Sequence, residues 1–126
     1  MRNIVIYEGD DLMRSLLGEW LSEAGYRVHA VASHDLRNNR LDEILAAADL
    51  VIVSVSMPKQ AGAQLVREIQ AVHPGTPVIA LSGQFHPGLS ANGAIAQALG
   101  VQQVIAKPLT RSDLLGAVRA IIGPPG

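Results

Sequence analysis

The chain has 126 residues, 48% of them hydrophobic and 17% charged, which is typical of one compact folded domain and excludes a disordered segment. A formal net charge of −1 provides no overall field for nucleic acid or acidic lipid, and the lack of cysteine excludes disulfides, thiolate catalysis and cysteine metal sites. Since no signal peptide or membrane-spanning pattern opens the sequence, we expect a cytoplasmic location.

The first third of the sequence predicts a strand, a helix and a second strand. Asn3–Tyr7 is a short apolar run, and apolar residues then recur at helical spacing over Leu12–Ala24, where Gly25 can end the helix. A strand is predicted at Arg27–Ala32. The next helix, within Ser33–Ala48, has a less regular pattern.

The middle of the chain is organised around Leu50–Ser54, a short apolar run that ends in a serine. Such a run is typical of a central strand of a parallel sheet, buried on both faces. A helix is predicted to open at Gln60-Ala61-Gly62 and to end at His73-Pro74-Gly75. The next predicted strand is Pro77–Ser82.

The last third predicts a short helix of small residues that ends at Leu99, a strand at Val101–Ala106 and a final amphipathic helix. Thr110 and Asp113 have the spacing of a capping box at the start of that final helix.

Strands that alternate with helices predict an α/β fold, here a flavodoxin-like, doubly wound parallel sheet with strand order 2-1-3-4-5. We expect one domain over residues 1–123 and a tail or linker stub at 124–126. Ligands of such sheets bind beyond the carboxyl ends of the strands, where the strand order reverses. Glu8 and Ser54 follow or end the two strands at that point, so we expect them side by side.

Polar residues stand at the ends of four predicted strands. Glu8-Gly9-Asp10-Asp11 follows the first, Ser54 ends the third four residues before Pro58, Ser82 ends the fourth, and Lys107-Pro108 follows the fifth. Over essentially the whole chain, this pattern resembles the receiver domain of two-component response regulators. The most specific part is the Lys-Pro pair before a capped helix.

The resemblance implies a role for each of these positions. In that family an aspartate at the end of the third strand accepts a phosphoryl group from a histidine kinase, beside an acidic pair that holds magnesium. A hydroxyl and a lysine contact the phosphoryl oxygens, and Ser82 and Lys107 match these two positions. Glu8 matches the first acidic position, whereas Gly9 replaces the second and Ser54 replaces the phosphoacceptor.

These replacements change the chemistry that the resemblance implies. Magnesium prefers several oxygen ligands with carboxylate charge, so we expect no cofactor and no specific magnesium binding. A serine needs a base to become a nucleophile, and no histidine is placed by sequence to serve. The switch positions are Ser82 and Val104, and Val104 has no aromatic ring. If the alignment slips by one residue, Asp10 becomes a weak metal candidate beside Glu8.

Each of these residues also has a plainer interpretation. Ser54 can simply satisfy an amide at a strand end, and Lys107 can form a structural salt bridge with Glu8. Asp10 and Asp11 are placed to cap the helix that follows them.

We therefore predict a degenerate receiver, phosphorylation-independent and not an enzyme, that acts as a protein-interaction module. Its expected partners are a histidine kinase, another receiver or an output domain, and a homodimer is a further option. We expect this domain to bind neither nucleic acid nor membrane. One alternative is a phosphorelay receiver with a shifted or atypical acceptor. Another is a small flavodoxin-like hydrolase or ligand-binding protein that uses Ser54, although no base or cofactor motif accompanies this serine.

An interaction face is predicted from the distribution of charge. No Asp, Glu, Lys or Arg occurs between Glu68 and Lys107. The resemblance implies that the fifth strand and its two flanking helices form a dimer or output face, and an uncharged helix lowers the desolvation cost of association. A short uncharged surface helix without a partner is the alternative. The residues expected on this face are Ala91, Ala94, Ala98, Arg111 and Arg119.

Overall fold

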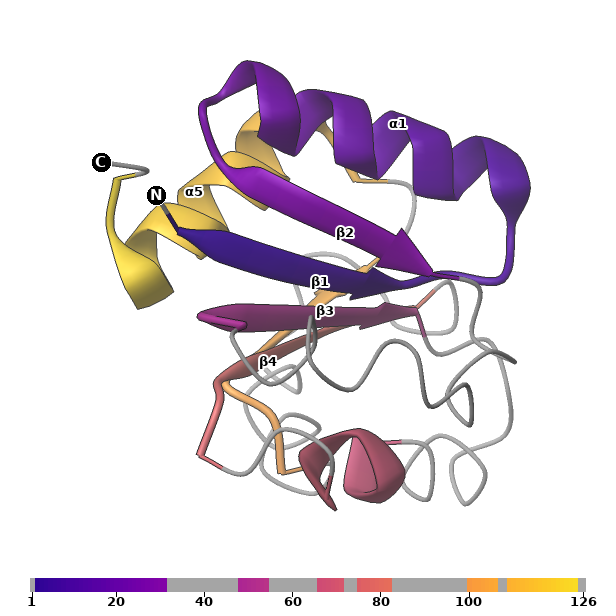
Figure 1. Cartoon of the computed structure of the whole chain (residues 1–126), viewed down its shortest axis with the longest axis vertical. Coiled ribbons are helices and arrows are strands. Elements are labelled where there is room, and N and C mark those ends of the chain that lie inside the picture. Colours follow the sequence, from indigo (N-terminus) through magenta and orange to yellow (C-terminus); the bar gives the residue numbers. More distant parts are fainter. Residues whose placement is uncertain are drawn as a thin grey trace.

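The computed structural model describes residues 2–31, 48–54, 66–71, 75–82, 100–106 and 109–124 (Figure 1). Residues 66–71 are helical. The other described elements are β1 (Asn3–Tyr7), α1 (Asp11–Glu23), β2 (Arg27–Val31), β3 (Leu50–Ser54), β4 (Val78–Ser82), β5 (Gln103–Ala106) and α5 (Arg111–Ile122).

The strands form one parallel sheet in the order β2-β1-β3-β4-β5, as predicted from the sequence. Tyr7, the last residue of β1, lies opposite Val31 of β2 and Val53 of β3. The strand order places the switch point of this topology between β1 and β3.

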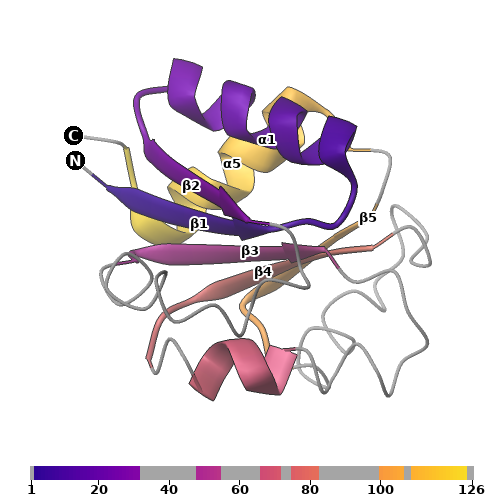
Figure 2. The same ribbon diagram turned by 45° about the vertical axis from the view of Figure 1, so that its right-hand side comes forward.

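Helices cover both faces of the sheet, α1 and α5 on one face and residues 66–71 on the other (Figure 2). The alternation of side chains along each strand divides the core into two clusters. The cluster under α1 and α5 includes Ile4, Ile6, Leu50, Ile52, Leu17 and Leu114. The cluster on the opposite face includes Val5, Tyr7, Val51, Val53, Val66 and Ile69.

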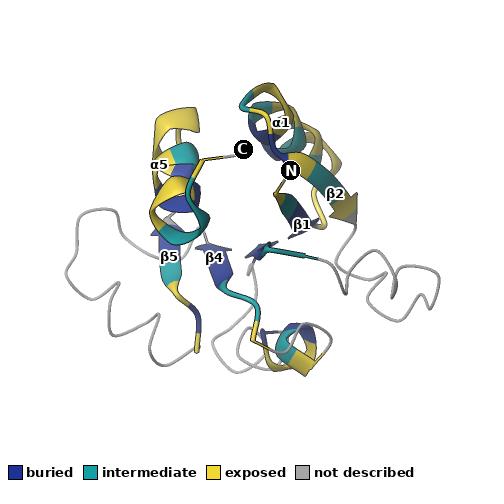
Figure 3. Ribbon diagram, turned by 60° about the vertical axis from the view of Figure 1, so that its left-hand side comes forward, coloured by how far each residue is buried: buried dark blue, intermediate teal, exposed yellow. Residues whose placement is uncertain are grey.

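The strand β4 is buried (Figure 3), and the central strand β3 beside it is buried along its whole length, as its apolar run predicts. Its four apolar residues have no exposed surface, and full burial of a side chain of this size contributes about 1.5–3 kcal/mol. The strand ends at Ser54, which is itself buried. This core therefore fixes the position of the strand end that carries the candidate site.

Several element boundaries differ from the sequence-based expectation. Helix α1 begins at Asp11, one residue early, because Asp10 is its N-cap. β4 begins at Val78, after Pro77, and β5 begins at Gln103, two residues later than expected. The Gln102 side-chain oxygen accepts a hydrogen bond from the Val78 amide at 3.0 Å. This amide therefore bonds to a side chain and not to a backbone carbonyl of the neighbouring strand.

Some expectations lie outside the described residues. They are the helix within 33–48, the start of the helix at 60–62, the helix that ends at Leu99, and Lys107. Within the part of the chain that the structure describes, no helix has the length and apolar character needed to cross a membrane.

Candidate functional site

The carboxyl ends of β1 and β3 bring the first two site residues together. Tyr7 and Val53 are register partners, and Glu8 and Ser54 come next along the two strands. Glu8 is 3% exposed and Ser54 7% exposed, although one is charged and the other polar. Buried polar groups need hydrogen-bond partners. Both side chains therefore lie among protein groups at the strand ends and not on a solvated surface.

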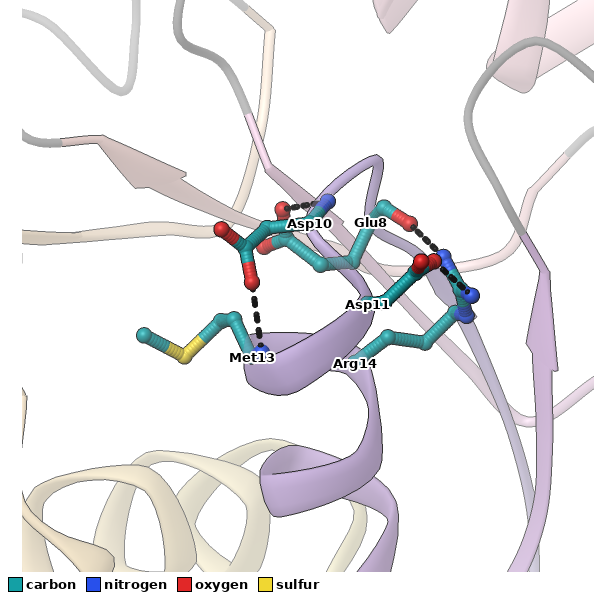
Figure 4. A network of polar contacts seen from close by, with 5 residues as sticks. All are labelled: Glu8, Asp10, Asp11, Met13 and Arg14. Carbon is teal, nitrogen blue, oxygen red and sulfur yellow. Dashed lines mark hydrogen bonds and ion pairs between the residues drawn. The ribbon is translucent and has the colours of Figure 1, made fainter.

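The turn between β1 and α1 directs its carboxylates toward local amide groups (Figure 4). The Glu8 carboxylate accepts a hydrogen bond from the Asp10 amide at 3.1 Å. The Asp10 carboxylate accepts one from the Met13 amide at 2.8 Å, and Asp10 is the N-cap of α1. The prediction that Asp10 caps the helix is therefore confirmed.

Arg14 is part of this turn, and sequence reasoning missed it. Its guanidinium donates a hydrogen bond to the Glu8 backbone carbonyl at 2.9 Å and forms an ion pair with Asp11. The spacing of Asp11 and Arg14, three residues apart at a helix start, was the available signal for the ion pair. No spacing rule connects Arg14 to the carbonyl of Glu8, six residues earlier.

These contacts test whether the turn fits the magnesium ion that the resemblance implies. Magnesium needs near-octahedral oxygen ligation. Gly9 supplies no side chain, the Asp10 carboxylate is bound to the Met13 amide, and Asp11 is paired with Arg14. Among the described residues, no three His, Cys, Asp or Glu side chains are grouped to hold a metal ion. The described donors do not fit a magnesium site of the family type.

The ends of β4 and β5 carry the next positions. Ser82 ends β4 as register partner of Ala106, the last residue of β5, so the backbone places Ser82 near the position before Lys107. Lys107 itself lies outside the described residues. Val104 is 5% exposed and belongs to the core cluster on the face opposite α1 and α5.

Of the proposed interaction face, the structure describes the two arginines of α5. A guanidinium nitrogen of Arg111 lies 3.3 Å from a carboxylate oxygen of Glu23, so this side chain links α5 to α1. Arg119 is exposed near the end of α5. The three alanines, Ala91, Ala94 and Ala98, lie outside the described residues.

Comparison with curated proteins shows related sequences along nearly the whole chain. The chain is 30% identical over 122 residues to the transcriptional regulatory protein CpxR of Escherichia coli (strain K12). The alignment covers 97% of this chain and 50% of CpxR. It is 27% identical over 124 residues to the regulatory protein VirG of Agrobacterium fabrum, covering 97% of this chain and 46% of VirG. The chain thus spans about half the length of these relatives.

Solved structures of related fold include a receiver domain protein and a chemotaxis protein. A response regulator receiver domain protein from Clostridium thermocellum superposes with a TM-score of 0.76 at 27% identity, covering 97% of this chain and 94% of that one. The chemotaxis protein CheY4 of Vibrio cholerae has a TM-score of 0.75 at 21% identity, covering 96% and 98%, and shares the fold.

The sequence profile described as "Response regulator receiver domain" matches residues 4–119. Domains of this kind are signalling modules that act with histidine kinases and output domains in two-component systems. With the parallel sheet in the order 2-1-3-4-5, and with Glu8 and Ser54 at the ends of adjacent strands, the chain belongs to the response regulator receiver domain family.

Proposed function

We propose that this chain is an atypical receiver domain that acts in the cytoplasm as a phosphorylation-independent protein-interaction module, without enzymatic activity. One observation carries the proposal: Ser54 stands at the buried end of β3, next to Glu8, where the family places its phosphoacceptor aspartate. Gly9 adds to it, because the second acidic position has no side chain.

The chemistry of phosphoryl transfer supports this proposal. Such transfer depends on positioning and on cations that neutralise charge at the phosphoryl oxygens. A serine hydroxyl must also lose its proton before it attacks. In the described turn, the Asp10 carboxylate accepts from the Met13 amide and the Asp11 carboxylate pairs with Arg14, and these contacts compete with a role as metal ligand or as base for Ser54.

The intact scaffold supports a binding role. The two core clusters bury the whole of β3, so the strand that ends in Ser54 is packed on both faces. The partners that fit this family are a histidine kinase, another receiver, an output domain or a second copy of the chain. We propose that they bind the face expected to bear Ala91, Ala94, Ala98, Arg111 and Arg119, because the segment that contains the three alanines has no charged residue.

The proposal is tested by incubating four proteins with acetyl phosphate and magnesium and measuring intact mass. They are the wild type, Ser54→Asp, Gly9→Asp and the double variant. We expect no phosphoryl adduct on the wild type or on either single variant, because each lacks the acceptor or a metal ligand. The double variant regains both carboxylates and should be labelled.

Labelling of the wild type would overturn the proposal outright and would favour an atypical acceptor. A labelled Ser54→Asp single variant would show that Glu8 suffices to hold the metal. If the double variant is folded by circular dichroism and stays unlabelled, the geometry at the strand ends has diverged from that of active receivers.

A further inference from the structure

Gln102, the residue before β5, binds β4 through both its backbone and its side chain. Its backbone amide donates to the Val78 carbonyl at 2.9 Å, and its side-chain oxygen accepts from the Val78 amide at 3.0 Å. The amide and the carbonyl of the first residue of β4 are therefore both bonded to one glutamine. The side-chain bond is partly buried, although Gln102 itself is an exposed residue.

A second glutamine holds the turn that leads into the same strand. The Gln70 side chain, from the helix at 66–71, donates to the Gly100 carbonyl at 2.6 Å. Gly100 has a φ of 77°, a conformation that residues with a side chain rarely adopt. The segment 100–102 is thus held by the helix at 66–71 on one side and by the start of β4 on the other.

These contacts have weight because β5 is the last strand in the order β2-β1-β3-β4-β5. Among the described strands, its ladder of hydrogen bonds runs to β4 alone (Figure 2). A strand that is paired on one side opens locally more readily than one that is paired on both. The bonds made by Gln102 at its start therefore contribute to how firmly the rest of β5 is held.

β5 also carries positions of the candidate site. Val104 occupies the switch position that the resemblance implies, and Ala106 is the register partner of Ser82. Val104 is 5% exposed and packs in the core cluster on the face opposite α1 and α5. Both anchoring side chains are carboxamides, which do not titrate, so these bonds do not depend on a protonation state.

We propose that Gln102 is a clasp that holds β5 in a single position on β4, so that the proposed binding face, to which the resemblance assigns this strand, is preformed without any change at Ser54. The inference rests on the proposed function, because it explains how a receiver that takes no phosphoryl group presents a fixed face to a partner. Gln102 acts through β5 and is a positioning residue. The Gln70 contact is exposed to water and is the weaker of the two anchors.

Backbone NMR tests the clasp without any phosphoryl donor. Gln102→Met keeps the length of the side chain and loses the acceptor, and it leaves the core intact because this residue is exposed. Gln102→Glu keeps an acceptor oxygen and is the matched control. In Gln102→Met we expect the protected amides of β5 to exchange about fivefold faster, and those of β1 and β3 to change less than about twofold. Relaxation dispersion at Val104 should be flat in the wild type and in Gln102→Glu, and should show microsecond-to-millisecond exchange in Gln102→Met.

Four results would overturn the inference. They are unchanged exchange of β5 in Gln102→Met, an acceleration that β1 and β3 share equally, equal behaviour of the Met and Glu variants, and dispersion at Val104 in the wild type. The second of these would mean a general loss of stability and no local hold on β5. The acetyl phosphate experiment is separate, since labelling of the wild type would refute the proposed function while exchange in Gln102→Met would still decide whether the clasp exists.

Discussion

Ser54 and Gly9 stand at the ends of β3 and β1 without charge, where the family has acids. A carboxylate at either position would need a counter-ion, since Glu8 already stands there almost fully buried. In the described turn, the guanidinium of Arg14 pairs with the Asp11 carboxylate and donates to the backbone carbonyl of Glu8.

A single hydroxyl connects distant parts of the chain at Tyr26. It donates a hydrogen bond to the Gly123 carbonyl at 2.8 Å, although the two residues are 97 positions apart. Tyr26 is 3% exposed, and its ring packs in the core under α1 and α5. The bond ties the turn before β2 to the C-terminal end of α5.

We expect Tyr26→Phe to lower the free energy of unfolding by about 1 kcal/mol, because the ring stays packed and only the hydrogen bond is lost. Urea denaturation should show a lower midpoint with an unchanged m-value. An unchanged midpoint would mean that water replaces the hydroxyl without cost at the partly exposed Gly123 carbonyl.

At the scale of elements, α1 and α5 each begin with a side-chain cap. Asp10 caps α1, and α5 begins with a complete capping box. The Thr110 hydroxyl accepts from the Asp113 amide at 3.1 Å, and the Asp113 carboxylate accepts from the Thr110 amide at 3.3 Å. These caps satisfy amides that the helix leaves unbonded, and they direct each helix away from a strand end that belongs to the site.

Thr110→Ala removes the hydroxyl half of the capping box. We expect a loss of about 1 kcal/mol in the free energy of unfolding. For a domain of this size, thermal denaturation should show a melting temperature lower by about 3–6 °C. Thr110→Ser keeps the hydroxyl and is the matched control. A Ser variant as unstable as the Ala variant would show that the methyl group of Thr110 contributes more than its cap.

At the scale of the whole molecule, the sheet is covered on one face by α1 and α5, which an ion pair between Glu23 and Arg111 also links. This pairing directs Arg111 toward α1. Arg119, which stays exposed on α5, is the better candidate of the two arginines for a partner surface. The uncharged segment between Glu68 and Lys107 is the other component of the face that we propose for binding.

Association tests that face. Ala94→Glu and Ala98→Glu each introduce a charge that must be desolvated in an interface, so we expect at least a fivefold weaker self-association or partner binding, about 1 kcal/mol or more. Analytical ultracentrifugation and a pull-down with a histidine kinase or receiver measure the two cases. Ser15→Glu, at an exposed position of α1, is the matched control. If neither substitution weakens self-association or partner binding, the predicted binding face is wrong.

The sequence by itself determined the features that depend on residues close together in the chain, such as hydrophobic patterning and helix caps. The apolar run Leu50–Ser54 predicts a strand buried on both faces, and the spacing of Thr110 and Asp113 predicts a capping box. Strand order followed from the alternation of strands and helices, and from it the placement of Glu8 beside Ser54. These predictions succeed because periodicity, caps and crossover handedness are set by neighbouring residues and by chain geometry.

Only the tertiary structure decided which side chains meet across larger separations. The Gln102 side chain accepts a hydrogen bond from the Val78 amide, Tyr26 reaches Gly123, and Arg14 turns back to the carbonyl of Glu8. No pattern of spacing specifies such contacts, because a long side chain chooses its rotamer according to the acceptors that folding places within reach. The family resemblance of the sequence identified Gly9 and Ser54 as positions that lack an acid, and the folded chain showed what the neighbouring acids contact: the Met13 amide for Asp10 and Arg14 for Asp11.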